Sequence, residues 1–159
     1  MIRITKQTDY GIVLLTHLAA APERPLNAPE LSNETRLPLP MVSKILKLLV
    51  REGLLVSHRG VKGGYSLSRQ PEEISMAEVV TALEGPIAIT ECIDDEGGCS
   101  HAPICPVSGR WHRINAALRD ALAGISLAEM TETARPQPKL VTLGGRRPGL
   151  AGVPLLPEH

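Results

Sequence analysis

Residues 41–69 have the sequence MVSKILKLLVREGLLVSHRGVKGGYSLSR. In the first part of this stretch, apolar residues recur three and four positions apart, which predicts an amphipathic helix from about Met41 to Glu52. Gly53 follows, the residue type that commonly stands just after a helix. The side opposite the apolar stripe carries one hydroxyl group and three cations: Ser43, Lys44, Lys47 and Arg51. We therefore expect one buried face and one basic, exposed face.

Two short β-like runs follow this helix, at 54–57 and 65–68. The seven residues between them include three glycines, which permit a tight hairpin, and they place Arg59 and Lys62 at its tip. A short helix is also predicted just before the basic one, because Asn27 is followed three residues later by Glu30, the pattern of a capping box. Two short helices followed by a basic hairpin indicate a winged helix-turn-helix, which binds DNA.

The same criteria predict further helices on both sides of this motif. One spans 8–21, and two begin at the capping sequences SMAE (75–78) and SLAE (126–129). A longer amphipathic helix is expected at 106–123, and its apolar positions are Val107, Trp111, Ile114, Leu118 and Leu122. Because it lies apart from the winged motif, we expect it to form a dimer interface; the alternative is that it covers its own domain.

The expected fold class is mainly α: a winged helix-turn-helix of three helices and a β-hairpin wing, followed by a long dimerisation helix. We divide the chain into four parts. Residues 1–85 form the DNA-binding domain, 86–105 a cysteine-rich loop, and 106–135 the dimerisation helix with a short terminal helix. Residues 136–159 contain five prolines and four glycines, a composition typical of a flexible tail.

Composition narrows the possible functions. The net charge is zero, yet residues 1–70 carry ten Lys/Arg against five Asp/Glu, whereas residues 71–159 carry seven against twelve. A basic first half favours contact with a polyanion. Aromatic residues make up only 2% of the chain, which argues against recognition of RNA by base stacking. The chain has neither an apolar run of about 20 residues nor a signal-peptide pattern, so we expect a cytoplasmic protein without membrane contact.

The three cysteines, Cys92, Cys99 and Cys105, lie within fourteen residues. An odd number without a secretion signal favours metal or redox chemistry over disulfides. Thiolates are soft ligands, so an iron–sulfur cluster and a zinc ion both suit the spacing, and a segment without metal remains a third alternative. No fourth cysteine is available. The local candidates for a fourth ligand are Asp94, Asp95, Glu96, His101 and His112.

Several motifs make the chain resemble the Rrf-type winged-helix regulators, the family that contains IscR and NsrR. They are MIRITKQTDYGI at the start, LVREGLLVSHRGVKGGYSLSR across the basic helix and wing, EISMAEVVTALEGPI, the cysteine triad, and ISLAEM near residue 130. The resemblance covers about residues 1–131. The runs GPIAITEC and WHRINAALRDAL are most similar to the branch that regulates the SUF operon for iron–sulfur assembly.

The resemblance implies a homodimeric repressor with one [2Fe–2S] or [4Fe–4S] cluster per subunit on Cys92, Cys99 and Cys105. It also implies that the basic helix enters the major groove, with Ser43 and Lys44 at base-contacting positions, and that Arg59 reaches the minor groove. We assign Lys47, Arg51 and Lys62 to phosphate contacts, which position a protein on DNA without specifying sequence. The implied partners are therefore an operator in double-stranded DNA and a second copy of the chain.

The fourth ligand differs within the family. IscR-like members have a histidine three residues after the last cysteine, but that position is Ser108 here. NsrR-like members use an aspartate near the N-terminus of the other subunit, and the matching residue is Asp9, within KQTDYG. His101 and His112 remain alternatives to Asp9.

The expected function is a transcriptional repressor of iron–sulfur assembly genes that senses cluster status, and not an enzyme. One alternative is a winged-helix regulator whose cysteines bind zinc or act as a thiol redox switch. Another is a metalloenzyme or electron carrier that uses the same triad. We disfavour this last class because the sequence offers no phosphate-binding glycine loop and no acid–base pair of recognisable spacing, so no small-molecule substrate is expected.

Overall fold

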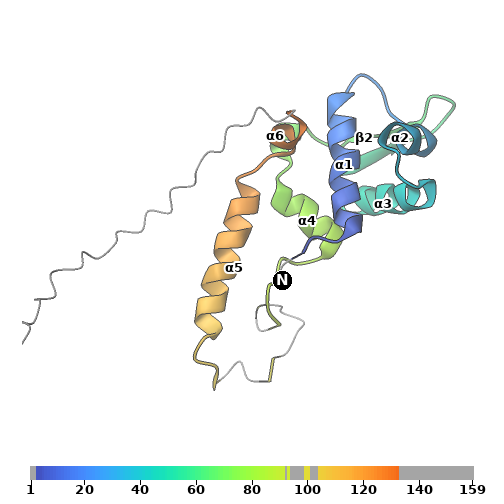
Figure 1. Cartoon of the computed structure of the whole chain (residues 1–159). Coiled ribbons are helices and arrows are strands. Elements are labelled where there is room, and N and C mark those ends of the chain that lie inside the picture. The colour runs from blue at the N-terminus through green and yellow to red at the C-terminus, as the bar shows by residue number, and fades with distance from the viewer. Residues whose placement is uncertain (1–2, 92, 94–98, 101–103, 133–159) are drawn as a thin grey trace, which may run out of the picture.

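The computed structural model describes residues 3–91, 93, 99–100 and 104–132. In chain order, its elements are α1 (Lys6–Ala20), α2 (Ala28–Thr35), α3 (Leu39–Arg51), β1 (Leu55–His58), β2 (Gly64–Leu67), the 3-10 turn η1 (Pro71–Glu73), α4 (Met76–Glu84), α5 (Ser108–Ala123) and α6 (Leu127–Thr131). Helices α1 to α3 cluster at one end, and α5 runs alongside α4 at the other (Figure 1). The mainly helical fold with a two-stranded wing is confirmed. The proposed tail, 136–159, lies outside the described residues.

The predicted capping boxes are all present. Asn27 and Glu30 cap α2, Ser75 and Glu78 cap α4, and Ser126 and Glu129 cap α6, each pair bonding reciprocally to backbone N–H groups. Such boxes satisfy donors that a helix start otherwise leaves without partners. Local sequence therefore defines where these three helices begin.

Three helix starts differ from the prediction. Helix α1 begins at Lys6 rather than at residue 8. Helix α3 begins at Leu39 rather than Met41, with Pro40 inside its first turn, where a proline ring is tolerated because the missing N–H would have no helical partner. The turn before α3 is correspondingly shorter, and it passes through Arg36 at a φ of 58°. Helix α5 begins at Ser108 rather than Pro106.

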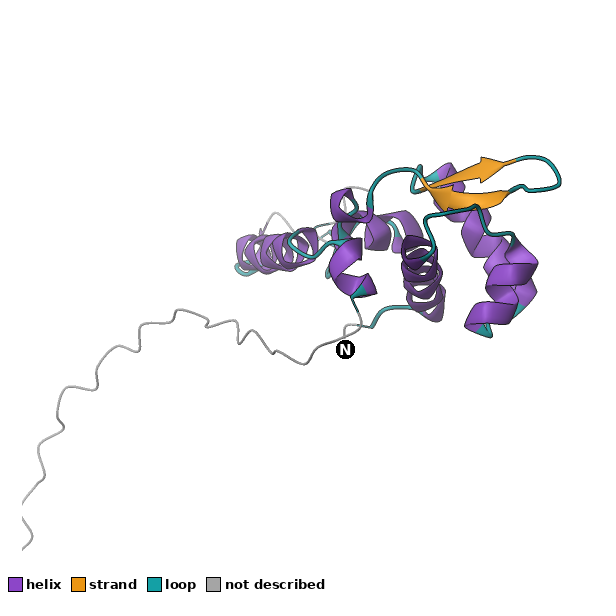
Figure 2. Ribbon diagram, turned by 90° about the horizontal axis from the view of Figure 1, so that it is seen from above, coloured by secondary structure: helices purple, strands orange, loops and turns teal. Residues whose placement is uncertain are grey.

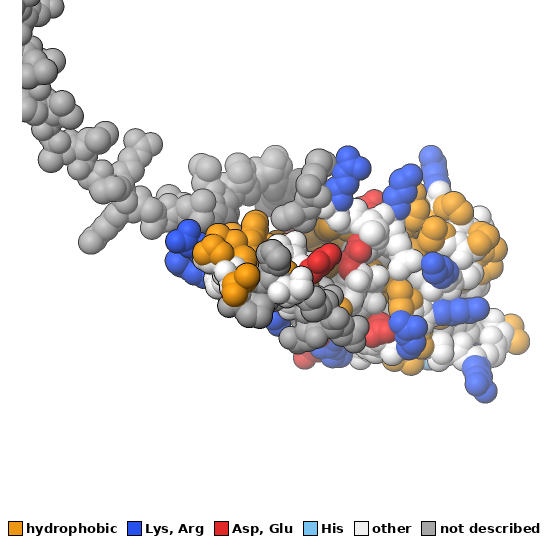
Figure 3. All heavy atoms as spheres, turned by 90° about the horizontal axis from the view of Figure 1, so that it is seen from below, with side chains coloured by type: hydrophobic (Ala, Val, Ile, Leu, Met, Phe, Trp, Pro, Cys, Tyr) orange, Lys and Arg blue, Asp and Glu red, His pale blue; other side chains and the backbone are white. Residues whose placement is uncertain are grey.

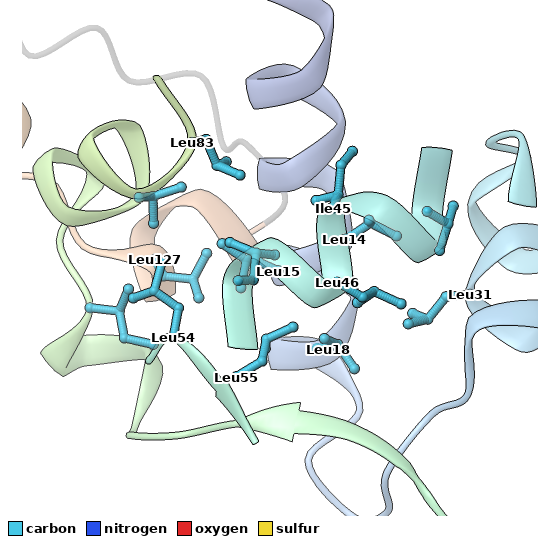
Figure 4. Packing of buried hydrophobic residues seen from close by; sticks show 14 of the residues in the cluster. Leu14, Leu15, Leu18, Leu31, Ile45, Leu46, Leu54, Leu55, Leu83 and Leu127 are labelled. Atoms are coloured by element: carbon cyan, nitrogen blue, oxygen red, sulfur yellow. The ribbon is translucent and has the colours of Figure 1, made fainter. Parts of the chain in front are cut away.

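One apolar core holds the winged part together. Leu14, Leu15 and Leu18 of α1 point toward Ile45 and Leu46 of α3 (Figure 4), and all five are 3% exposed or less. The remaining labelled residues close the core from other elements: Leu31, Leu54, Leu55, Leu83 and Leu127. Leu127 shows that α6, although distant in sequence, packs into the same core. The winged part and α6 therefore form one packed unit.

Two short backbone bridges attach later elements to this unit. Leu26 exchanges two hydrogen bonds with Tyr65, at 3.1 and 2.8 Å, which fixes strand β2 of the wing to the loop before α2. The Met76 N–H donates to the Ile125 carbonyl, and the Leu127 N–H donates to the Ile74 carbonyl, both at 2.8 Å. The second bridge holds the start of α6 beside the start of α4, so the C-terminal end of α5 is fixed to the winged part.

Helix α5 is mostly exposed. Within the described part of the chain, Asn115 is its one buried residue, whereas Trp111 and Ile114 are 37% and 50% exposed and Val107, at the N-cap, is 40% exposed. Leu122, at the other end of the predicted apolar stripe, is half-buried against the core. Packing within the chain therefore covers one end of this stripe and leaves the other end exposed. None of the described helices combines the length and apolar character needed to cross a membrane.

Candidate DNA interface and cysteine segment

Helix α3 has the two faces that its sequence predicts. Val42, Ile45, Leu46 and Leu49 are completely buried. On the other side Lys44, Lys47 and Arg51 are exposed and Ser43 is half-buried. The basic groups are therefore available to a partner, because the hydrophobic stripe fixes the rotation of the helix against α1.

The turn between α2 and α3 is held by the Ser32 hydroxyl, which donates to the Leu37 carbonyl at 2.6 Å. At the far end of α3, the Arg51 Nε donates to the Glu52 Oε1 at 2.8 Å. This ion pair is exposed, so it contributes little to stability and leaves Arg51 able to exchange its carboxylate partner for a phosphate.

The wing is an antiparallel hairpin in which Leu55 pairs with Leu67 and His58 with Gly64. The hairpin projects from the end of the molecule opposite α5 (Figure 2). Its tip passes through Gly60 at a φ of 107°, a conformation that favours glycine. Arg59 and Lys62 are both exposed there. The tip therefore presents two cations away from the body of the protein.

The glycine pair GG at 63–64 is required by close packing. A Cβ at Gly63 would lie 2.3 Å from the His58 carbonyl oxygen, and one at Gly64 would lie 2.6 Å from the Leu26 carbonyl oxygen. Both neighbours are backbone atoms, which cannot give way as a flexible side chain can. The pair thus allows the hairpin to close and lets strand β2 contact Leu26.

Charge is unevenly distributed over the surface. Figure 3 shows Lys and Arg side chains spread over the end of the molecule that holds the winged part, a second group of them at the opposite end, and Asp and Glu side chains nearer the middle. The predicted DNA-contacting residues belong to two elements of this end, α3 and the wing. A surface of this kind attracts the phosphate backbone of a nucleic acid.

The cysteine segment connects α4 to α5. Cys99 and Cys105 are free, half-buried thiols. Cys92 and His101 lie outside the described residues, as do Asp94, Asp95 and Glu96. Within the described ranges, no three His, Cys, Asp or Glu residues come together as a metal-binding group. The donor chemistry nevertheless fits a soft metal centre, because two of the three clustered cysteines are available as thiols.

The two remaining candidate ligands lie on helices. Asp9 is exposed in the first turn of α1, where a carboxylate is favoured by the positive end of the helix dipole. His112 is exposed on the first turns of α5, seven residues after Cys105. The described residues do not bring Asp9 and His112 into one ligand group with Cys99 and Cys105. The fourth ligand stays a prediction.

The start of α1 is tied to the end of α4, just before the cysteine segment. The Thr5 N–H and the Thr8 hydroxyl both donate to the Glu84 Oε1, at 2.9 and 2.6 Å. These bonds, that from the Thr8 hydroxyl foremost, hold the pKa of Glu84 below its usual value because they favour the carboxylate. Gly85 then ends α4 at a φ of 94°.

Sequence reasoning missed Thr8, Glu84 and Asn115. Thr8 and Glu84 are 76 residues apart and meet only because α1 packs against α4, so no local signal identified them. Asn115 did carry a signal: it lies four residues after Trp111 and three before Leu118, on the edge of the predicted apolar stripe. A poor helix former with a polar side chain at such a position has a specific partner in many proteins.

The winged helix-turn-helix and its basic face define a DNA-binding regulator. The profile of the Rrf2 family, described as an iron-dependent transcriptional regulator, matches residues 4–133. The chain belongs to this Rrf2 family of winged-helix transcriptional regulators. The sequence-based assignment to the family is confirmed.

Individual relatives agree with this assignment. A putative HTH-type transcriptional regulator, ORF2 of Azotobacter vinelandii, is 32% identical over 97% of this chain and 93% of its own length. The transcriptional regulator IscR of Aliivibrio salmonicida is 28% identical over 81% of this chain and 77% of its own length. The solved structure of CymR, the global cysteine regulator of Bacillus subtilis, superposes with a TM-score of 0.66 at 26% identity, covering 82% and 97% of the two chains. These names give no support to the enzyme alternative.

Proposed function

We propose that this protein is a homodimeric repressor whose affinity for its operator depends on an iron–sulfur cluster held by Cys92, Cys99 and Cys105. The observation that carries the proposal is the position of the cysteine segment. It joins α4, which is packed in the winged part, to the start of α5, where large apolar side chains are exposed in the described chain. A ligand bound to this segment is placed to change how two winged domains are held relative to each other.

On the operator, α3 enters the major groove, where Ser43 and Lys44 contact bases. Lys47, Arg51 and Lys62 contact phosphates, and Arg59 at the wing tip reaches the minor groove. The exposure of all five cations supports this assignment. Because phosphate contacts release counterions, we expect affinity to fall steeply as the salt concentration rises.

The dimer forms through α5. Val107, Trp111 and Ile114 are large apolar side chains with 40%, 37% and 50% exposure, and a second copy of α5 would cover them. An Ile114→Asp substitution should shift the protein from dimer to monomer in sedimentation equilibrium. Asp120→Asn, at an exposed position of the same helix, is the control and should remain dimeric.

The proposed fourth ligand is Asp9 of the second subunit, with His101 and His112 as alternatives. When bound, a cluster supplies a centre whose presence depends on iron supply and oxidants. The cysteine segment is then held in one arrangement, and the two α3 helices of the dimer are kept at the spacing of successive major grooves. Loss of that arrangement weakens binding because the two states differ in operator affinity.

The first test is the content of iron, acid-labile sulfide and zinc per chain in protein purified without oxygen. Near-equal iron and sulfide support the proposal, and their amounts distinguish a two-iron from a four-iron centre. The second test is Cys99→Ala in matched gel-shift titrations. Unchanged operator affinity would contradict the mechanism, because Cys99 lies in neither α3 nor the wing. Sequencing the DNA retained by the native dimer tests the expected SUF-type target genes.

A second candidate is a winged-helix regulator that uses its cysteines for zinc or as a thiol redox switch. Cys99 and Cys105 are free, half-buried thiols, which suits this second candidate as well as it suits the cluster. Zinc without sulfide in the purified protein would select this candidate and leave the DNA-binding part of the proposal in place.

A further inference from the structure

Asn115 makes a two-point contact with the chain that leads into the cysteine segment. Its side chain is on α5 and the residue is 3% exposed. The Asn115 Nδ2 donates to the Ile87 carbonyl at 2.8 Å, and the Ile89 N–H donates to the Asn115 Oδ1 at 3.2 Å. Both ends of the amide are therefore satisfied by the backbone of residues 87–89, as a neighbouring β-strand would satisfy them.

This contact replaces regular structure that the segment lacks. Residues 86–91 belong to no helix or strand, so their backbone groups need partners from elsewhere in the protein. Asparagine is a poor residue for the interior of a helix, and an apolar residue would continue the stripe of α5. The presence of a buried amide here indicates that holding Ile87 and Ile89 is the role of the side chain.

The far end of the cysteine segment is also attached to α5. The Cys105 carbonyl accepts hydrogen bonds from the Ser108 N–H at 3.4 Å and from the Ser108 hydroxyl at 3.2 Å. Ser108 and Asn115 are seven residues apart on one helix, which corresponds to about two turns. Within the described residues, Asn115 and Ser108 therefore bond to the chain on the two sides of the cysteine segment, at Ile89 and at Cys105.

We propose that Asn115 is a positioning residue for the cysteine segment: by holding Ile87 and Ile89 against α5, it sets where the chain enters the metal-binding segment and couples that segment to α5. The metal part of this statement rests on the proposed function. The positioning part does not, because it concerns the metal-free chain. Asn115 acts through the backbone of Ile87 and Ile89, which lie five and three residues before Cys92.

The positioning role is tested in the metal-free, full-length protein by hydrogen exchange of the Ile89 amide. In Asn115→Ala we expect exchange at least about tenfold faster than in the wild type, because the N–H loses its acceptor. The Leu46 amide, in the core of α3, is the internal reference and should be unchanged. Asp120→Ala, at an exposed position on α5, should leave both amides unchanged. An unchanged Ile89 amide in Asn115→Ala would overturn the proposal.

Asn115→Asp adds a pH signature that a packing role would not produce. An ionised carboxylate can accept from the Ile89 N–H but repels the Ile87 carbonyl oxygen, whereas the neutral acid can donate to it. Burial raises the pKa of such a carboxyl group, so the neutral form persists toward neutral pH. The 13C chemical shift of the Ile87 carbonyl should therefore change between about pH 5.5 and pH 8 in the variant and stay constant in the wild type. A shift that stays constant in both proteins would contradict the two-point contact.

The coupling to metal is tested by the rate at which iron is lost to a chelator after anaerobic reconstitution. Outer-sphere substitutions commonly weaken metal sites by about 10- to 100-fold, so Asn115→Ala should lose iron roughly tenfold faster than the wild type or Asp120→Ala. If the wild type takes up no iron, the proposed function fails while the exchange data still decide the positioning role. If exchange accelerates but iron loss does not, the coupling is wrong.

Discussion

The helices α3 and α5 are of similar length but are used in opposite ways. Of thirteen residues in α3, four are buried, and they are all apolar. Of sixteen residues in α5, the one that is buried is the polar Asn115. Helix α3 is therefore fixed by fully buried apolar side chains, whereas α5 packs against α4 with half-buried side chains and one buried amide.

This difference in packing indicates different roles for the two helices. Packing against α1 fixes the rotation of α3, and the basic face is consequently presented in one orientation whether or not a ligand is bound. Helix α5 packs against α4 and contacts the core through Leu122, whereas its first turns are largely exposed. If the proposed function holds, we expect the winged part to stay constant while the arrangement of α5 responds to the second subunit and to what binds the cysteine segment.

The largest effect is expected from Leu46→Ala. Leu46 is completely buried between α1 and α3, and truncation of such a leucine lowers the free energy of unfolding by about 2–5 kcal/mol. Urea denaturation measures the loss. The matched variant Ile114→Ala, on the exposed face of α5, should change stability by less than about 0.5 kcal/mol at concentrations where the protein is monomeric. Equal losses in the two variants would contradict the contrast between the helices.

Next in size is the effect of Arg59→Ala on operator affinity. If Arg59 reaches the minor groove as we propose, its removal should cost about 1–3 kcal/mol of binding free energy, or roughly 10- to 100-fold in Kd. The measurement is a fluorescence anisotropy titration at fixed salt. Arg119→Ala removes an equal charge from α5 and is the control. If both variants weaken binding alike, net charge and not the wing tip determines affinity.

A smaller effect is expected from the cap of α4. The Ser75 hydroxyl accepts from the Glu78 N–H at 3.3 Å, and the Glu78 carboxylate bonds back to the Ser75 N–H at 2.9 Å. Ser75→Ala should therefore lower the free energy of unfolding by about 1 kcal/mol in thermal or urea denaturation, and Ser75→Thr should restore most of it. A loss that threonine does not restore would show that packing around Ser75, and not its hydroxyl, is responsible.

The sequence predicted local features well and distant contacts poorly. Capping boxes at Asn27, Ser75 and Ser126 were identified because a cap is a matter of residues three positions apart. The wing was identified because its hairpin and glycines are contiguous. The sequence predicts the start of α3 two residues late, because prolines are typical of turns although the first helical turn also accepts them.

The contacts around the cysteine segment depend on tertiary packing. The bonds from Thr8 to Glu84 and from Asn115 to Ile87 span 76 and 28 residues, and no periodicity relates such positions. Resemblance to a family supplied the cysteine triad as a ligand set, but it carries no information about the polar residues that hold the segment in place. These polar residues meet their partners because α1 and α5 both pack against α4.

The smallest effect concerns the pH dependence contributed by Glu84, which joins the winged part to the start of the cysteine segment. Bonds from Thr8 and Thr5 lower the pKa of Glu84 in the folded protein, so the unfolded chain binds a proton more readily. The stability gained is fully present above the unfolded pKa and is lost as pH falls through the folded pKa. Glu84→Gln should therefore be less stable than the wild type near neutral pH, by less than about 0.5 kcal/mol because the carboxylate is exposed.

The difference in stability between Glu84→Gln and the wild type should disappear in acid, as measured by urea denaturation at a series of pH values. Glu30 and Glu78 also have a lowered pKa, but they are present in both proteins and cancel in the comparison. A stability difference that persists in acid would therefore show that Glu84 acts by its shape and not by its charge.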